Sequence, residues 1–169
     1  VENPVRVTRK NITIRGAEDF RPGIEFRPIA GGDGVQPRML TVTGGPLQVI
    51  NTELRMVVPR MASEPLALFS LQRPEQIRLR DVVVTIVNPG VRPAAVIELT
   101  PAPGQMRNMK KMMKEEMPAE PLELTMDHSF IRGHADLIYV RQTDSAEVSL
   151  NHCVLALGGS LLHAVGASG

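Results

Sequence analysis

Short segments in which apolar and polar residues alternate recur along the chain at similar intervals. Five of them share the order apolar, apolar, variable, apolar: Met39–Val42, Leu68–Leu71, Val96–Leu99, Leu137–Val140 and Leu162–Val165. Their first residues lie 29, 28, 41 and 25 positions apart. Self-similarity at such a period indicates a repeat architecture in which each repeat is one small set of secondary structure elements.

A second kind of segment recurs four times and aligns without a gap: Leu47–Met56, Ile77–Ile86, Leu124–Gly133 and Val148–Leu157. Its first, third and eighth positions are always apolar, which is the period-two pattern of a strand on each side of a break. The break is the fifth position, which we call the corner column; it holds Asn51, Asp81, His128 and His152. These residue types tolerate left-handed or turn geometry. The pattern therefore predicts two strands joined by a one-residue corner.

Each repeat thus consists of strand, loop, strand, corner and strand in 25 to 29 residues, which suits one coil of a parallel β-solenoid with three faces. One coil cannot bury its own inward face, whereas stacking turns each inward column into a continuous aliphatic ladder. Runs such as VVVTIV and frequent Pro and Gly disfavour helical repeats.

Over residues 39–165 this coil pattern, including IRLRDVVVTI and VSLNHCVLAL, resembles the right-handed parallel β-helix, the pectin-lyase-like superfold. The predicted fold is therefore an all-β, right-handed parallel β-helix of about five to six coils. Val5–Ile14 and Gly23–Phe26 are expected to form a preceding, irregular coil. We interpret residues 1–169 as one β-helix domain that is a segment of a longer solenoid, whose open edges allow end-to-end association.

One coil carries an insertion at residues 101–121. Prolines bracket a run of good helix formers, which predicts a short helix at about 105–117. A methionine stripe lies at helical spacing on it: Met106, Met109, Met113 and Met117. The stripe can pack on the flank of the solenoid, dock a partner as an arm, or bind Cu(I) through thioethers; we favour packing.

Composition excludes several function classes without choosing a partner. The 19 Lys and Arg against 18 Asp and Glu give a formal net charge of +1, so charge does not favour nucleic acid. No apolar run approaches the roughly 18 residues of a transmembrane segment. A single cysteine, Cys153, excludes an internal disulfide and a cysteine zinc site.

The corner column is the most visible polar series, and it has two interpretations. Stacked polar side chains at such a corner cap the backbone and hydrogen-bond along the axis, which is a structural role. Alternatively, His128 and His152 on adjacent coils could share a metal. Two imidazoles without a third ligand make a poor zinc site, so we favour the structural role and expect no metal and no cofactor.

Two outward faces are candidate binding surfaces. On one, Arg78, Arg80 and Asp127 come from neighbouring coils, and Arg80 is expected to form an exposed ion pair with Asp127. On the other, Glu98, Tyr139 and Arg141 gather on adjacent coils, beside an outward Ala164. Carboxylate, phenol and guanidinium groups can hold a sugar or a uronate.

The resemblance implies enzymes that cleave polysaccharides with clustered acidic residues, and this chain departs from that pattern. Its aspartates Asp81, Asp127, Asp136 and Asp144 are not expected to pair on one outward patch. Three hypotheses remain. The first is a non-catalytic segment of a larger bacterial surface or secreted protein that presents a flat face to a polysaccharide or a protein. The second is a pectin-lyase-like enzyme with catalytic residues partly outside this chain. The third is an architectural spacer whose Met-rich arm recruits a partner.

Overall fold

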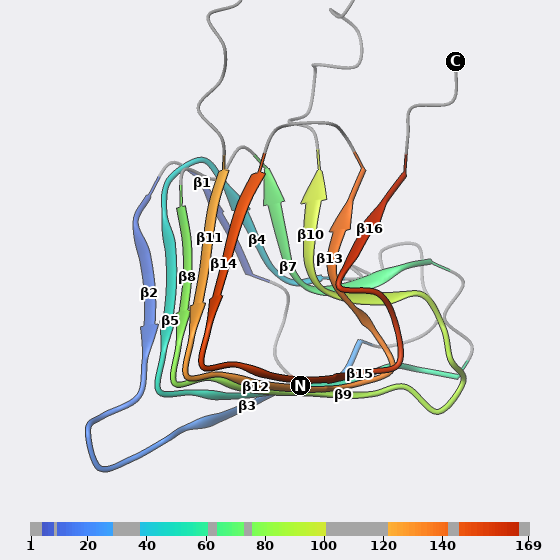
Figure 1. Cartoon of the computed structure of the whole chain (residues 1–169), viewed down its shortest axis with the longest axis horizontal. Helices are drawn as coiled ribbons and strands as arrows, with labels where there is room; N and C mark the ends of the chain where they lie inside the picture. The colour runs from blue at the N-terminus through green and yellow to red at the C-terminus, as the bar shows by residue number, and fades with distance from the viewer. Residues whose placement is uncertain are drawn as a thin grey trace, which may run out of the picture.

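The computed structural model describes residues 5–8, 10–28, 38–60, 64–72, 76–100, 122–141 and 146–165. These residues form an all-β structure of 16 strands in three parallel sheets, consistent with a parallel β-solenoid (Figure 1). Within these ranges there is no helix, so none is long and apolar enough to cross a membrane. The helix expected at 105–117, with Met106, Met109, Met113 and Met117, lies outside the described residues.

Each sheet collects strands from successive repeats. In spatial order, sheet A contains β1 (Val5–Thr8), β4 (Arg38–Thr43), β7 (Leu66–Gln72), β10 (Ala94–Thr100), β13 (Asp136–Val140) and β16 (Leu162–Ala164). Sheet B contains β14 (Ala146–Asn151), β11 (Leu122–Asp127), β8 (Gln76–Arg80), β5 (Leu47–Ile50) and β2 (Ile12–Arg15). Sheet C contains β15 (Val154–Leu157), β12 (Phe130–Gly133), β9 (Val83–Val87), β6 (Glu53–Val57) and β3 (Gly23–Phe26).

From β2 onward the chain visits sheets B, C and A in a fixed order, and we call each such set of three strands a triplet. In Figure 1 sheet B runs down the left side, sheet C crosses the bottom, and sheet A rises facing sheet B. Every strand pair between successive triplets is parallel among the ladders of the described residues. Segments 24 to 47 residues apart in sequence therefore lie side by side.

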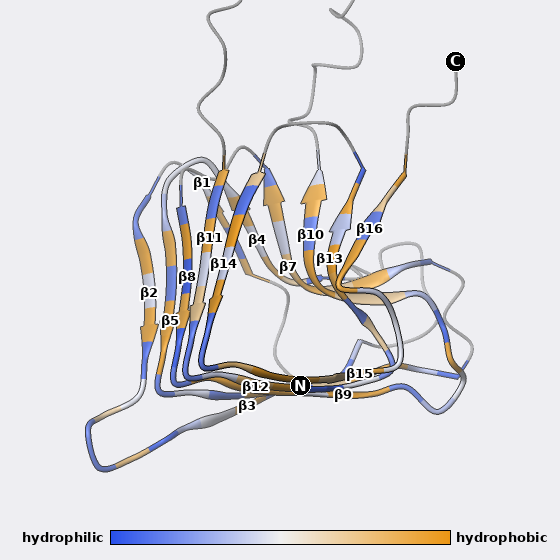
Figure 2. Ribbon diagram, in the orientation of Figure 1, coloured by the Kyte–Doolittle hydropathy of each residue, from blue (hydrophilic) through white to orange (hydrophobic). Residues whose placement is uncertain are grey.

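The inward columns have the register that the sequence alignment predicts. Leu124 lies between Ile77 and Val148 in sheet B, while Leu54 pairs with Val84 in sheet C. Ile77, Leu124, Leu54 and Val84 are all buried. Alternating apolar and polar bands along the strands are visible in Figure 2. The core thus consists of columns of stacked aliphatic side chains, and each repeat contributes one side chain to each column.

All four residues of the corner column have positive φ, from 46° to 55°: Asn51, Asp81, His128 and His152. Where the residue after the corner carries a hydroxyl group, that group donates a hydrogen bond to the carbonyl of the residue before the corner. Thr52 Oγ1 donates to the Ile50 carbonyl at 2.9 Å, and Ser129 Oγ donates to the Asp127 carbonyl at 2.9 Å. The repeated bond explains the hydroxyl residues that follow two of the four corners; Val82 and Cys153 follow the other two.

The last repeat is shifted by one residue from the sequence alignment. Leu162 pairs with Ile138 rather than with Leu137, and His163 therefore lies beside Tyr139. The expectation that Ala164 is the outward neighbour of Tyr139 is wrong, because Ala164 pairs with the inward Val140. Adjacent leucines at 161 and 162 fit the apolar pattern in either register, so hydrophobicity alone does not choose between them.

Sheet A differs from the other sheets because both of its sides are covered near the middle. Leu68, Phe69 and Leu71 belong to the hydrophobic core, while Ser70 and Glu98 on the outer side are buried as well. Pro65, Val91 and Pro93, which precede β7 and β10, line this outer side together with Glu98. Ser70 and Glu98 are therefore removed from water although they lie outside the core.

Candidate functional site

Glu98, on the outer side of β10, is the most strongly partnered polar side chain of sheet A, and it is only 2% exposed. Arg38 donates from Nε to Glu98 Oε2 at 2.6 Å and from Nη2 to Oε1 at 2.8 Å. Arg141 donates from Nε to Oε1 at 2.8 Å. This buried carboxylate therefore binds two guanidinium groups of the same chain.

The charge of Glu98 follows from its surroundings. Burial alone raises the pKa of a carboxyl group, but the hydrogen bond and charge of Arg38, the charge of Arg141 and the Ser70 hydroxyl outweigh it. The pKa of Glu98 is consequently below its ordinary value. The expectation that Glu98 offers an exposed carboxylate to a ligand is corrected, because its oxygens are buried against Arg38 and Arg141.

Small side chains on β7 allow this network to form. Arg38 on β4 reaches Glu98 on β10 across the intervening strand, where its register partner is Ala67 and that of Glu98 is Ser70. A larger residue at either position would stand between the guanidinium and the carboxylate. The sequence separation of 60 residues is thus bridged by two strand spacings.

A pocket of about 520 Å³ opens on this outer side of sheet A. Its apolar wall comes from the connections and first residues of β7 and β10, and includes Pro65, Ala67, Pro93 and Ala95. Its polar lining includes Glu98, Asp136, Tyr139 and His163. The volume lies within the range of small-molecule sites, which is roughly 300 to 1,000 Å³.

Four of the polar side chains around the pocket hold one another in place. Asp136 Oδ1 accepts the Ser160 backbone N–H at 2.7 Å, and Asp136 Oδ2 lies 2.9 Å from His163 Nδ1. The rings of Tyr139 and His163 meet edge to face at 5.1 Å. Arg141 Cζ lies 5.4 Å from the Tyr139 ring centroid. These contacts fix the positions of an imidazole, a phenol and a guanidinium on adjacent strands.

One wall of the pocket is strained. Val91 has a φ of 49°, which is unfavourable for a β-branched residue and costs on the order of 1 to 3 kcal/mol. Asn88 holds the turn: its Nδ2 donates to the Arg92 and His134 carbonyls at 2.6 and 2.8 Å, and its Oδ1 accepts the Arg92 N–H at 2.9 Å. Such strain is concentrated at binding and catalytic sites in other proteins.

The outer face of sheet B carries the other candidate residues. Arg78 lies beside Thr125, and Arg80 lies beside Asp127, as the alignment predicts. The ion pair expected between Arg80 and Asp127 is replaced by one between Arg80 and Asp81 at 3.6 Å. Asp127 instead contacts the corner column.

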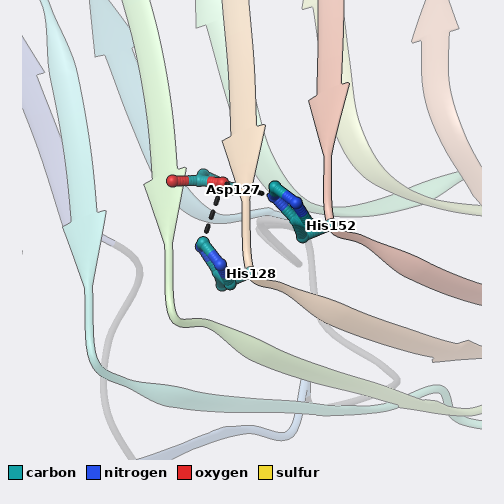
Figure 3. A group of neighbouring side chains, drawn as sticks. All are labelled: Asp127, His128 and His152. Carbon is teal, nitrogen blue, oxygen red and sulfur yellow. Dashed lines mark ion pairs between the residues drawn. The ribbon is translucent and has the colours of Figure 1, made fainter.

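Asp127, His128 and His152 form a compact group, drawn in Figure 3, in which Asp127 is half-buried and both histidines are exposed. Asp127 Oδ1 lies 3.0 Å from His128 Nδ1 and 3.8 Å from His152 Nδ1. The two imidazole rings stack with centroids 4.7 Å apart and an interplanar angle of 12°. The sequence argument against a metal is the lack of a third ligand, and Asp127 supplies a third donor atom.

Sequence reasoning misses three residues of these sites. His163 is hidden by the one-residue shift of the last repeat, and Arg38 precedes the recognised segment of its strand. Asp136 is the first residue of β13. The sequence analysis weighs it only as a partner for other acidic residues, and not as a partner for a histidine. The alternative alignment of Leu161 with Leu137 is the signal that would place His163 beside Tyr139.

The chain matches no family model, no curated protein and no solved structure. The resemblance to the pectin-lyase-like superfold therefore rests on the repeat pattern, and functional conclusions rest on the geometry of the two sites.

Proposed function

We propose that this chain is a non-catalytic binding segment of a right-handed parallel β-helix of about five to six coils. The parent is a larger bacterial surface or secreted protein, and the ligand is a polysaccharide that places a sugar unit in the pocket beside Tyr139. The observation that carries the proposal is the pocket of about 520 Å³, with an apolar wall on one side and fixed polar groups on the other.

The lining suits a saccharide because a sugar ring has apolar C–H faces and a polar edge. Pro65 and Pro93 offer a surface for the C–H groups, while Tyr139 and His163 provide hydroxyl and imidazole groups for the edge. Arg141 remains 39% exposed although it donates to Glu98, so its side chain stays accessible to a ligand carboxylate. A rigid sheet positions all of these groups.

The charge state of Glu98 favours binding over hydrolysis. Glycosidases need one carboxyl group that is protonated and can act as a general acid. Two guanidinium groups keep the pKa of Glu98 low, so the group is ionised at neutral pH and has no proton to donate. Asp136, the second carboxylate of the lining, is engaged by Ser160 and His163.

Native affinity electrophoresis tests the proposal. The purified chain is run through gels that contain neutral or acidic polysaccharides, with and without calcium, and each gel is then stained for polymer loss. We expect retardation without clearing in at least one gel. Tyr139→Ala should abolish the retardation, whereas Arg78→Ala, a matched exposed change on sheet B, should preserve it.

Equal retardation of the wild type and Tyr139→Ala would contradict the pocket as the binding site. Loss in Arg78→Ala alone would move the site to sheet B. No retardation in any gel would contradict saccharide binding and support the spacer hypothesis, in which the segment with Met106, Met109, Met113 and Met117 recruits a partner.

Carbohydrate cleavage is the second candidate, and one observation favours it. Asp136 holds His163 by its Nδ1, which is the arrangement that orients an imidazole as a general base. The same gels distinguish the two candidates. If the wild type clears the polymer stain and His163→Ala does not, the chain is an enzyme.

A further inference from the structure

We propose that Asp127, His128 and His152 bind a divalent transition-metal ion, with Zn²⁺ as the representative ion. This site is separate from the saccharide pocket and lies at the corner between sheets B and C. Asp127 and His128 belong to one triplet and His152 to the next, so a bound ion would bridge two triplets.

The donor atoms have nearly the spacing that a tetrahedral ion requires. Zinc bonds to histidine nitrogen and carboxylate oxygen are about 2.0 to 2.2 Å long, which places neighbouring ligand atoms about 3.3 Å apart. The separations of His128 Nδ1 and His152 Nδ1 from Asp127 Oδ1, 3.0 Å and 3.8 Å, lie on either side of this value. All three donor atoms lie within 4.8 Å of one another. A rotation of the exposed imidazoles out of their stack completes the geometry.

Hydrogen bonds or an ion pair occupy the side chains of Asn51 and Asp81, whereas those of the two histidines stack on each other. Asn51 donates from Nδ2 to the Ala17 carbonyl at 2.6 Å and accepts from Arg21 Nε at 3.2 Å. Asp81 forms an ion pair with Arg80. In the described part of the chain, His128 and His152 have ion-pair contacts only with Asp127. Their side chains are 58% and 75% exposed, and among the described residues neither forms a hydrogen bond to the backbone of the corner.

The local charge favours a cation. Asp127 and Asp81 contribute two carboxylates, against one guanidinium from Arg80, which is already paired with Asp81. Asn151, the register partner of Asp127 on β14, is neutral. A cation at this corner therefore gains more from the carboxylates than it loses to the guanidinium.

The donor set selects the class of ion. Two imidazoles and one carboxylate suit zinc and neighbouring transition metals, whereas calcium and magnesium prefer oxygen ligands alone. Because the side chains are exposed, water can fill the remaining coordination position.

Isothermal titration calorimetry of the tag-free chain with Zn²⁺ tests the site. We expect one strong site per chain and no heat of binding with Mg²⁺ or Ca²⁺. His152→Asn and Asp127→Asn should each weaken zinc binding by about tenfold or more, since each removes a ligand. Asparagine occupies the same corner at Asn51 with φ 49°, so His152→Asn preserves the backbone geometry.

His134→Asn is the matched control, because it removes an imidazole that lies outside the cluster. It should bind zinc as the wild type does. Histidine ring NMR gives a second readout: zinc should shift the resonances of His128 and His152 and leave those of His134 and His163 in place. Equal zinc affinity in the wild type and His152→Asn would overturn the proposal, as would an equal loss in His134→Asn.

Discussion

The two charged groups on the outer surface differ in how fully their own chain satisfies them. Around Glu98, three hydrogen bonds from two arginines occupy a carboxylate that is 2% exposed. Around Asp127, two exposed imidazoles lie near a carboxylate that is 34% exposed. The first arrangement binds three strands of sheet A together, whereas the second adds little to the fold.

The difference shows that burial decides which charged residues are free for ligands. A buried carboxylate must be paired, because an unpaired buried charge costs several kcal/mol. An exposed carboxylate is solvated by water, so an ion pair that it forms contributes only about 0 to 1 kcal/mol to the stability of the fold. Strong internal pairing thus removes Glu98 from binding, and weak pairing leaves Asp127 available.

The largest effect is expected from Glu98→Gln. Glutamine has nearly the same shape but no charge, so two guanidinium groups lose their counter-ion. Loss of one partner of a buried pair costs about 3 to 5 kcal/mol; because Arg141 and Arg38 are 39% and 23% exposed, we expect about 2 to 3 kcal/mol. Urea unfolding measures the free energy.

Glu123→Gln is the control, since Glu123 on β11 is exposed and accepts from Gln76 at 3.0 Å. It should change stability by less than about 0.5 kcal/mol. Similar values for the two variants would mean that burial does not distinguish Glu98 from an exposed carboxylate.

Acid should weaken the Glu98 network. The pKa of Glu98 is lower in the folded chain than its ordinary value of 4.5, so ionisation stabilises the folded state above that value. This stabilisation is lost as the pH falls through 4.5 toward the folded pKa. Urea unfolding between about pH 7 and about pH 3 should show a steeper loss in the wild type than in Glu98→Gln. Parallel curves would contradict the assignment.

The two arginines should differ in their contributions. Arg38 forms two hydrogen bonds to Glu98 and is 23% exposed, whereas Arg141 forms one and is 39% exposed. We expect Arg38→Met to lower the free energy of unfolding by about 2 kcal/mol and Arg141→Met by less than about 1 kcal/mol. Methionine retains the aliphatic stem in both. Equal losses in the two variants would mean that the second hydrogen bond of Arg38 adds nothing to the free energy of unfolding.

The core ladders are predictable because each inward column repeats. Leu47, Ile77, Leu124 and Val148 occupy one register in the sequence and in the structure. The same logic fails at Leu162, where two adjacent leucines satisfy the pattern in either register. Periodicity therefore fixes a strand's face only where its apolar residues alternate.

The polar sites are harder to predict, because they depend on what covers a face. Alternation assigns Glu98 to the outer side of sheet A, but its partner Arg38 lies 60 residues earlier in the chain. The contact between Asp127 and the histidines is missed for a different reason. The alignment assigns Asp127 to an ion pair with Arg80, although Asp127 directly precedes His128 in the chain.

The smallest effect is expected from changes at the exposed corner in the absence of metal. Asp127→Asn and His152→Asn should each alter the free energy of unfolding by less than about 0.5 kcal/mol, because the contacts that they remove are solvated. With Zn²⁺ the wild type should gain stability, since an ion that binds only the folded chain and joins two triplets favours folding. Both variants should gain less, because they bind zinc more weakly. Thermal unfolding with zinc, followed by chelation, measures this. A large loss without metal would show that the corner, like Glu98, serves the fold rather than a ligand.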